Sequence, residues 1–344
     1  MFNPKYTITD QLLANITQIN RLIRDLNDRR FPKVVLVEFE KKAREISAYA
    51  STSIEGNPLP LTDVKRILKL KPANIRDTEK EVINYNYALE SLNQLLKTSQ
   101  VELSLKLILD IHKQITDGLL PHFDSGKLRQ RPVVVNDPRT KKVVYLPPDV
   151  GKVKGLITDL VNYVKKVNGN IDPLILAGIF HKQMVIIHPF IDGNGRTTRL
   201  ATKVLLAKIK LDTFNLFSFE NYYNQNVTKY FQTVGEYGDY YDLAESIDFT
   251  IWLEYFTGGL IDELFRIKKL LPKVGNTPDT RLKNYHLEIM KYIKQNGYIE
   301  DNNYAKLTDR AKATRALDFK KLLDLELIER KGKGRSTYYI LKES

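Results

Sequence analysis

The segment HPFIDGNGRTTR, from His188 to Arg199, gathers an imidazole, a carboxylate, an amide, two glycines and two arginines. Apolar sequence flanks it, AGIFHKQMVII before and LATKVLLAKIK after, and both flanks have the character of buried helices. Pro189 disfavours helical backbone at the preceding residue, so the first helix should end near His188. The DGNG sequence can adopt left-handed conformations, and a second helix can begin at about Arg196. The segment therefore predicts a polar junction between two helices.

A glycine-containing loop that leads into a helix N-terminus can bind an anion, because free N–H groups and the positive end of the dipole face the same point. Arg196 and Arg199 are three residues apart and share a helix face. Two guanidinium groups there are unfavourable unless an anion fills the site, which indicates a polyphosphate. Asp192 is suited to hold Mg²⁺, and His188 can act as a general base near neutral pH.

Other phosphate and metal motifs do not match this segment. It lacks the GxxxxGK[ST] pattern and the third glycine of GxGxxG, and Arg196 stands where an EF-hand loop needs Asp or Asn. A purely structural alternative is a His-Pro helix break followed by a tight glycine turn. That alternative explains one or two of these residues well, but it does not account for all of them in this order.

The segment resembles the signature of the Fic family, HPFx[DE]GNGRxxR, with every fixed position filled. His181 also stands where family members often carry a histidine, and the resemblance extends from the first hundred residues to about Lys269. It implies a helical Fic domain that binds ATP with Mg²⁺ and transfers AMP to a protein hydroxyl, with pyrophosphate as the leaving group.

The resemblance also implies a role for each residue of the motif. His188 would deprotonate the attacking Ser, Thr or Tyr hydroxyl, and Asp192 would bind Mg²⁺. The groups implied to surround the phosphates are Gly193, Asn194, Gly195, Arg196 and, at the γ-phosphate, Arg199. Relatives that transfer phosphate carry lysine in place of Gly195, and this chain does not.

Two further segments match parts of the family. The sequence RPVVVNDPRTKKVVYLPP, residues 131–148, predicts a β-hairpin, which is marginal in water unless it packs on something else. Its Val133–Tyr145 part resembles the family's flap, which positions a target peptide by strand addition. Asn226 and Tyr230 resemble a later helix that closes the nucleotide pocket, although a tyrosine on an amphipathic helix is more often a core residue.

The stretch STSIEGNPL places Ser51 and Glu55 four residues apart, on one helix face, with Gly56 where the helix should end. A glutamate in a last helical turn faces the negative end of the dipole, at a cost of roughly 0.3–1 kcal/mol when exposed. Taken alone, this pattern predicts a solvated surface glutamate.

The stretch also matches the Fic inhibitory motif [S/T]xxxE[G/N]. The resemblance implies that Glu55 pairs with Arg199, which deprives the γ-phosphate of its partner and leaves ATP in an unproductive pose. Ser51 would steady the helix or the glutamate. The free enzyme should then be largely self-inhibited.

Helices are the main elements that the sequence predicts around these motifs. The expected ranges are 7–27 with a cap at Thr9 or Asp10, 32–56, Thr78–Thr98, Leu103–Gly118, Lys152–Val167, Pro173–Ile187, Arg196–Ile209, Asn221–Val234 and Phe249–Lys269. The predicted fold class is mainly α: a Fic-type helical bundle with a small β-hairpin flap, followed by a winged helix-turn-helix.

The sequence has 344 residues, a length that suits two or three domains. The expected divisions are 1–100 with the inhibitory helix, 101–270 as the catalytic domain, a linker over 271–280 and a winged-helix domain over 281–344. That last part carries 15 Lys or Arg against 9 Asp or Glu, and the wing RKGKGRS could lie along a phosphate backbone. The same module could equally serve protein contact.

Composition narrows the class of protein further. The net charge of +13 favours anionic partners, and the absence of cysteine excludes disulfides, thiolate zinc sites and cysteine nucleophiles. The N-terminus does not resemble a signal peptide and no apolar run is long enough to span a membrane, so a cytoplasmic location is expected.

The resulting hypothesis is a self-inhibited protein adenylyltransferase that uses ATP and Mg²⁺. Expected partners are a target protein with an accepting hydroxyl, the chain itself through self-modification, a second copy in a homodimer and DNA through residues 281–344. One alternative is AMP removal with the help of Glu55, or transfer of another phosphate-linked group on the same fold. Another class is a DNA-binding regulator whose Fic domain senses nucleotide.

Overall fold

A computed structural model describes residues 2–28, 33–70, 75–98, 101–137, 142–211, 213–274, 282–325 and 327–342. The chain is mainly helical, as predicted, and divides into two compact units. The first unit comprises Met1–Arg29 and Ala43–Ile267, and the second comprises Arg30–Lys42 and Lys268–Ser344. Among the described residues no helix has both the length and the apolar character needed to cross a bilayer.

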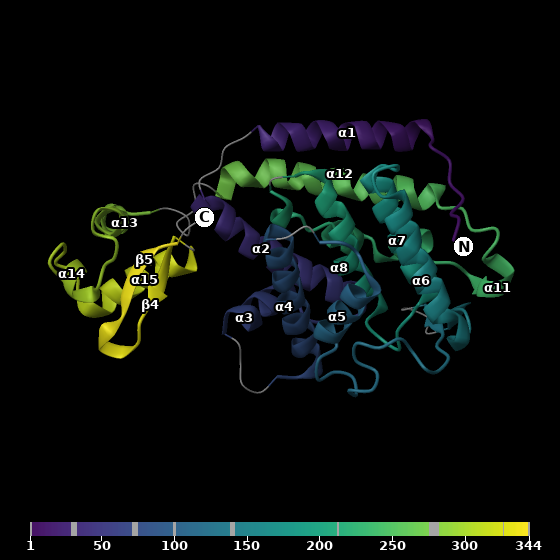
Figure 1. The fold of residues 1–344 in the computed structure, drawn as a ribbon, viewed down its shortest axis with the longest axis horizontal. Helices are drawn as coiled ribbons and strands as arrows, with labels where there is room; N and C mark the ends of the chain where they lie inside the picture. The colour runs from purple at the N-terminus through teal and green to yellow at the C-terminus, as the bar shows by residue number, and fades with distance from the viewer. Residues whose placement is uncertain are drawn as a thin grey trace. The chain divides into compact units, whose positions relative to one another are not determined.

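The helices that begin in or contribute to the first unit follow one another along most of the chain (Figure 1). They are α1 (Asp10–Asn27), α2 (Lys33–Ile54), α3 (Leu61–Leu70), α4 (Asp77–Thr98), α5 (Leu105–Ile115), α6 (Val150–Val167), α7 (Pro173–Ile187), α8 (Asn194–Leu206), α9 (Glu220–Gln225), α10 (Val227–Val234), α11 (Tyr240–Leu243) and α12 (Thr250–Val274). Single 3₁₀ turns occur at Ala207–Ile209 and Phe214–Leu216.

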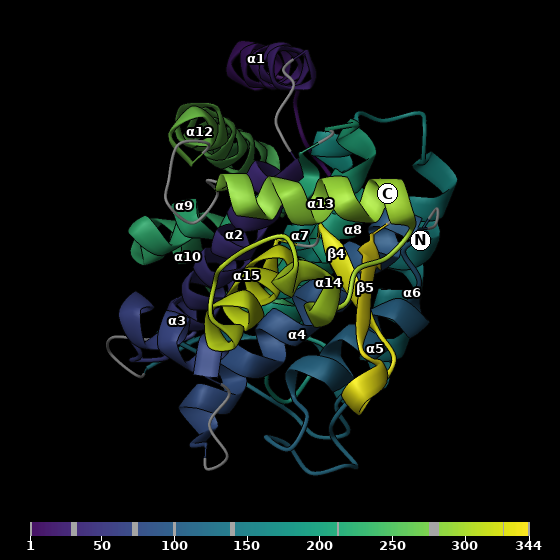
Figure 2. The same cartoon turned by 90° about the vertical axis from the view of Figure 1, so that its left-hand side faces the viewer.

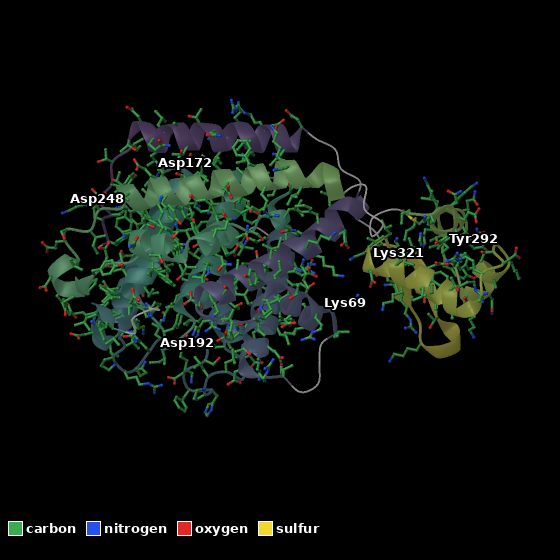
Figure 3. The ribbon with its side chains drawn as sticks, turned by 180° about the vertical axis from the view of Figure 1, so that it is seen from behind. Lys69, Asp172, Asp192, Asp248, Tyr292 and Lys321 are labelled. Atoms are coloured by element: carbon green, nitrogen blue, oxygen red, sulfur yellow. The ribbon has the colours of Figure 1, made fainter. Side chains whose placement is uncertain are left out.

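The core of this unit is the pair α7 and α8, whose residues are almost all buried. Helix α7 is buried on every side and mostly apolar, as expected for a helix enclosed by others. It begins with Pro173 after the capping side chain of Asp172, which accepts a hydrogen bond from Leu174 N. Its range agrees with the prediction. Figure 3 shows Asp172 and Asp192 at opposite ends of the region that α7 spans.

Helix α8 begins at Asn194, two residues before the predicted start at Arg196. The difference has a local cause. Gly193 has a left-handed backbone (φ 74°), and the Asn194 carboxamide accepts from Phe190 N and donates to Phe190 O, both at 2.9 Å. These bonds fold the loop back on itself, so that the helical turn starts directly after the glycine.

Helices α1 and α12 lie side by side at the edge of the first unit (Figures 1 and 2). Thr9 caps α1 by accepting a hydrogen bond from Leu12 N, as predicted. Its hydroxyl donates to Glu254, and Asn15 Nδ2 donates to Thr257 Oγ1 at 2.9 Å, which links the two helices.

The predicted hairpin is present as β1 (Val135–Asn136) and β2 (Val143–Leu146), which pair antiparallel; residues 138–141 of its turn lie outside the described residues. The hairpin does not stand alone. Strand β2 also pairs in parallel with β3 (Gly238–Asp239), and the buried Tyr145 hydroxyl donates to Ile186 O at 3.0 Å. This packing on the end of α7 provides the support that an isolated hairpin lacks.

The single helix predicted over Asn221–Val234 is wrong, because the chain breaks at Asn226 into α9 and α10. Asn226 leaves the helical region (φ −143°, ψ 73°), and its carboxamide oxygen accepts from Lys229 N at 3.0 Å. An Asn side chain that caps a following helix competes with continuation of the preceding one. Helices α3 and α11 and strand β3 were not predicted.

The second unit contains α13 (Asn284–Asn296), α14 (Asp301–Ala305), α15 (Lys312–Asp324), β4 (Ile328–Lys331) and β5 (Tyr338–Leu341). This is the predicted order of three helices and a two-stranded antiparallel hairpin (Figure 2). Its core is formed by Ile289, Ile293, Ile299, Tyr304, Phe319, Leu322 and Ile328. Of the predicted linker, residues 275–280 lie outside the described residues.

Candidate active site

Helix α7 ends at His188, as the Pro189 after it led us to expect. His188 itself has a left-handed backbone conformation (φ 49°), which was not predicted. The Nδ1 atom of its ring lies 3.4 Å from Val185 O. When Nδ1 carries the proton and donates it there, Nε2 is left as the basic atom. Burial lowers the pKa of His188 to about 4, so the ring is neutral at physiological pH.

A cavity of about 100 Å³ opens beside His188. The hairpin contributes Val135 and Tyr145 to its wall, α10 contributes Tyr230, and Glu55 approaches from the end of α2. Segments that are far apart in the sequence therefore converge on this histidine.

Arg129, which the sequence analysis missed, holds the backbone of the same turn. Its Nε donates to His188 O and its backbone N–H to Pro189 O, both at 2.9 Å. Its guanidinium also donates to Pro148 O at the end of the hairpin. Arg129 is almost fully buried, so it links the backbone at His188 to the base of the hairpin. An arginine in a polar stretch gives no sign of this in the sequence.

His112 on α5, also missed, supports the other end of the loop. Its Nδ1 accepts from Gly126 N at 2.9 Å, which leaves the proton on Nε2, and Nε2 donates to Asp192 O at 3.0 Å. The ring stacks on Phe190 with centroids 3.8 Å apart. Burial lowers the pKa of His112 to about 4, in keeping with a neutral ring that both donates and accepts.

We expect His112 to make folding pH-dependent. A lowered pKa means that the unfolded chain binds the proton more tightly, so this stability is full above about pH 6.5 and is lost as pH falls toward 4. Between pH 7.5 and pH 5 the free energy of unfolding should fall by about 2 kcal/mol more for the wild type than for His112→Gln. Urea unfolding of both chains at the two pH values measures this difference. Equal losses would contradict it.

The first turn of α8 carries the predicted anion site, and the Glu55 carboxylate lies over it. A Cβ atom at Gly195 would stand 2.0 Å from Glu55 Oε1 and 2.9 Å from Arg199 Nη1. Position 195 must therefore be glycine for the Glu55 carboxylate to approach the helix backbone so closely. The negative charge expected at this helix N-terminus is supplied by the chain's own carboxylate.

The same carboxylate contacts Arg199, which is fully buried. Arg199 Nη2 donates to Glu55 Oε1 and to Ser51 O, and Nε donates to Ser51 Oγ, each at 2.8 Å. Burial disfavours the charge of the guanidinium, but the Glu55 carboxylate together with the nearby Tyr230 and Tyr85 hydroxyls raises the pKa of Arg199 above its usual value. Ser51 binds the arginine directly, whereas the resemblance implied that it would steady the helix or the glutamate.

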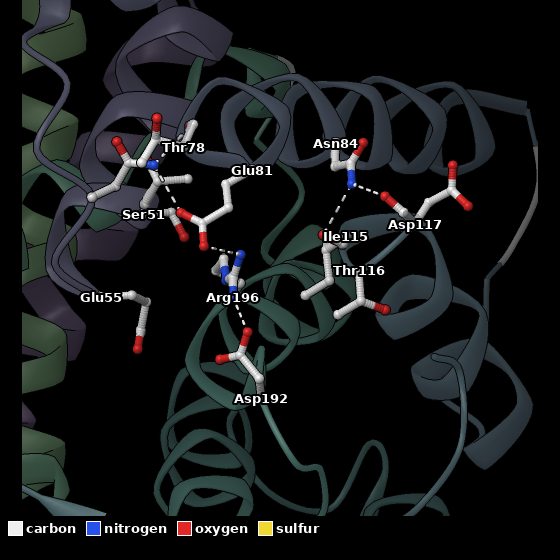
Figure 4. Close-up of polar contacts among 12 residues, drawn as sticks. Ser51, Glu55, Thr78, Glu81, Asn84, Ile115, Thr116, Asp117, Asp192 and Arg196 are labelled. Carbon is white, nitrogen blue, oxygen red and sulfur yellow. Dashed lines mark hydrogen bonds and ion pairs between the residues drawn. The ribbon is translucent and has the colours of Figure 1, made fainter. Parts of the chain in front are cut away.

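Arg196 lies between two carboxylates (Figure 4). Its Nη2 is 2.8 Å from Asp192 Oδ2 and its Nη1 is 3.3 Å from Glu81 Oε1. The Asp192 side chain is 56% exposed, while that of Arg196 is only 2% exposed. Glu81, on α4, is a third residue that the sequence analysis missed.

The residues present suit Mg²⁺ bound together with a nucleotide. Within the described part of the chain, no group of three or more His, Asp or Glu side chains could hold a metal ion by itself. Mg²⁺ is commonly held by one or two carboxylates with phosphates and water as its other ligands. The exposed Asp192 carboxylate beside the glycine loop provides such a ligand.

The remaining predicted residues lie at the wall of the cavity or behind it. Tyr230 lines the cavity, and its hydroxyl is 3.0 Å from His181 Nε2. His181 is fully buried, and burial followed by the nearby Arg199 charge lowers its pKa well below the ordinary value. His181 is therefore a neutral support for the tyrosine. Asn226 is placed at the cap of α10, where its side chain bonds to Lys229 N.

Fold and site together define a mainly helical protein with a glycine loop at the junction of two buried helices, where a histidine, an aspartate and two arginines meet. Residues 102–206 match the sequence model of the Fic/DOC family, and the chain therefore contains a Fic/DOC family domain.

Curated relatives resemble the chain over a wider region. The protein adenylyltransferase Fic of Aedes aegypti is 27% identical over 225 residues, and that of Drosophila willistoni is 26% identical over 225 residues. In both cases the match covers 60% of this chain and 43% of the relative. The chain thus spans less than half the length of these relatives.

Solved structures share the fold. A Fic family protein from Desulfovibrio desulfuricans G20 superposes with a TM-score of 0.67 and 22% identity, over 100% of this chain and 99% of its own. A Fic domain containing signaling protein from Bacteroides thetaiotaomicron gives a TM-score of 0.61 and 19% identity, over 80% of this chain. The mainly helical fold inferred from the sequence is confirmed.

Proposed function

We propose that the chain is a self-inhibited protein adenylyltransferase, which transfers AMP from ATP to a Ser, Thr or Tyr hydroxyl of a protein and releases pyrophosphate. The observation that carries the proposal is the Glu55 carboxylate, bound to Arg199 and seated on Gly195 in the cavity that His188 lines. Relatives named protein adenylyltransferase support the same chemistry.

In this proposal His188 Nε2 accepts the proton of the target hydroxyl as the oxygen attacks the α-phosphorus of ATP. A neutral imidazole is the form that can accept the proton, and the lowered pKa of His188 keeps it neutral. The α8 N-terminus and the two arginines stabilise the negative charge that develops on the phosphates. Asp192 would hold Mg²⁺, which when bound neutralises further phosphate charge.

The hairpin is proposed to present the target. Strand β2 has a partner on each side, whereas β1 lies at one edge of this small sheet, and its Val135 and Asn136 line the cavity. An extended peptide that paired with β1 would run beside His188, by the strand-addition mode of recognition. Tyr145 connects this hairpin to the backbone of α7, and Arg129 connects it to the backbone of His188.

Labelled nucleotide tests the reaction. The Glu55→Gly chain is incubated with ATP that carries label on either the α- or the γ-phosphate. AMP transfer places the α-label, and not the γ-label, on protein. Transfer of γ-label would instead show phosphate transfer and would overturn the proposal.

AMP removal is a second candidate because Glu55 and His188 line one cavity, and a carboxylate there could orient a water molecule. Protein that carries AMP, made with the Glu55→Gly chain, is then mixed with the wild type. Release of AMP by the wild type and not by Glu55→Gly would support this activity.

DNA contact through residues 281–344 is a candidate of another class. A hollow beside α15 and the β4–β5 hairpin is lined by Lys312 of the helix and Arg330 of the hairpin, together with the acidic Glu300 and Asp301. In contrast, Arg315 pairs with Asp301 at 2.8 Å and Arg310 pairs with Asp318 at 2.7 Å. These two arginines therefore form ion pairs within residues 281–344 and are less available to DNA phosphates.

If this hollow contacts DNA, gel-shift affinity for a duplex should fall steeply with salt, because phosphate contacts release counterions. The double variant Lys312→Ala/Arg330→Ala should reduce the slope of log K against log salt by about 2. Lys69→Ala/Lys97→Ala, which removes two charges from the first unit, is the matched control. An unchanged slope in the first double variant would exclude this hollow as the contact.

A further inference from the structure

Glu81 contacts Arg196 in the site, but the proposed function gives it no role. It lies on α4, its Oε1 is 3.3 Å from Arg196 Nη1, and its Oε2 accepts from Asn57 Nδ2 at 2.8 Å. Asn57 Nδ2 also donates to Thr78 O at 2.8 Å, near the start of the same helix. Figure 4 shows the Arg196 guanidinium between the Glu81 and Asp192 carboxylates.

The two carboxylates around Arg196 are held differently. Glu81 is 26% exposed and belongs to a helix that other contacts fix in place. One of these is Asn84 Nδ2, which donates to Asp117 O at 2.9 Å. Asp192 is 56% exposed and lies on the glycine loop. Glu81 is therefore the fixed partner of the arginine, and Asp192 is the partner open to solvent and to a ligand.

Arg196 needs an anionic partner in every state of the site, because a buried charge without one is strongly unfavourable. Its Nε and Nη1 atoms have no hydrogen-bond partner within the described residues, so the two ion pairs carry most of its compensation. When Asp192 shares its charge with a divalent cation, its attraction to Arg196 weakens. The arginine then depends on Glu81.

We propose that Glu81 is a positioning residue that keeps Arg196 paired and so leaves the Asp192 carboxylate available to the Mg²⁺ of the bound nucleotide. The inference rests on the proposed function and adds to it a determinant of metal affinity. A rival role has the opposite sign: if Glu81 withheld Arg196 from the phosphates, as Glu55 withholds Arg199, then its removal would strengthen nucleotide binding.

Equilibrium binding separates these roles without any turnover. Calorimetric titration with α,β-methylene-ATP, in which the bond to be cleaved is blocked, is repeated over a series of Mg²⁺ concentrations. The chains compared are Glu55→Gly and Glu55→Gly/Glu81→Gln. The charge lost with Glu81 should raise the half-saturating Mg²⁺ concentration roughly fivefold, the effect of a partly exposed charge pair. Glutamine keeps an oxygen for Asn57, so the change is confined mainly to charge.

Glu79→Gln is the matched control, because it removes the same charge from the same helix at a residue that pairs with Arg76. It should leave the Mg²⁺ dependence unchanged. Glu81→Asp keeps the charge and should shift the dependence by a smaller factor than Glu81→Gln. If Glu81→Gln does not fold, as judged by circular dichroism, Glu81→Asp decides alone, and no shift in it overturns the inference.

Two further results would decide between the role of Glu81 and the proposed function. A half-saturating Mg²⁺ concentration that stays the same or falls in Glu55→Gly/Glu81→Gln overturns the role of Glu81 and leaves the proposed function standing. Failure of Glu55→Gly itself to bind the nucleotide at any Mg²⁺ concentration overturns the proposed function, and the role of Glu81 with it.

Discussion

His188→Ala is expected to lower AMP transfer by about 1,000-fold, within the range that a positioned general base contributes. The variant is made in the Glu55→Gly chain, so that the starting activity is high enough to measure the loss. Alanine leaves the attacking hydroxyl without a base at the position that Nε2 occupies. The measurement is the initial rate of α-label incorporation into protein at saturating ATP and Mg²⁺.

The loss should appear in kcat and not in nucleotide affinity. His188 lines the cavity, whereas the arginines and the helix N-terminus proposed to bind the phosphates come from α8, so their geometry does not depend on the imidazole. The affinity for α,β-methylene-ATP should therefore stay within about threefold of that of the parent chain. His122→Ala replaces an exposed histidine and should keep full activity. Undiminished transfer by His188→Ala would mean that another group is the base.

The position of this junction could be predicted because local chemistry determines it. Pro173 begins α7 at the predicted residue, Pro189 ends the helix near His188, and the left-handed Gly193 begins the next one. Each effect acts within a few residues and is visible in the sequence. The pair of Glu55 with Arg199 could be expected only from the resemblance to a family, since its members are far apart in the chain.

The supports of the loop could not be predicted, because they act through tertiary contacts. His112 and Arg129 bind backbone carbonyls of the loop, and a backbone acceptor has no signature in the sequence. Glu81 resembles any charged residue of an amphipathic helix until α4 is placed beside α8. The break at Asn226 was missed for a related reason, since Asn occurs both inside helices and at their caps.

Glu55→Gly is expected to raise AMP transfer roughly 10- to 100-fold, the range that corresponds to the loss of a hydrogen-bonded charge pair. The substitution removes the carboxylate that occupies Arg199 and also clears the space over Gly195. The γ-phosphate can then bind Arg199 and occupy the space over Gly195. The measurement is α-label incorporation by wild type and variant at equal protein concentration, and equal incorporation would refute the inhibitory role.

Glu55→Gln separates the two contributions. Glutamine keeps the volume over Gly195 but loses the charge that holds Arg199, so we expect an activity between those of wild type and Glu55→Gly. If Glu55→Gln were as active as Glu55→Gly, the ion pair alone would account for inhibition. If it were as inactive as the wild type, the occupied space would be the dominant cause.

Activation by Glu55→Gly also requires that Arg199 stays in place once its carboxylate is gone, and Ser51 provides for this. The bonds from Arg199 Nε to Ser51 Oγ and from Nη2 to Ser51 O do not involve Glu55. The freed guanidinium should therefore remain aimed at the first turn of α8, where the γ-phosphate is expected.

Adding Ser51→Ala to Glu55→Gly removes one of these two bonds. The double variant should therefore bind nucleotide about tenfold less tightly than Glu55→Gly, which is the effect of one hydrogen bond to a charged group. Equal affinities would show that the backbone carbonyl of Ser51 is sufficient to hold the arginine.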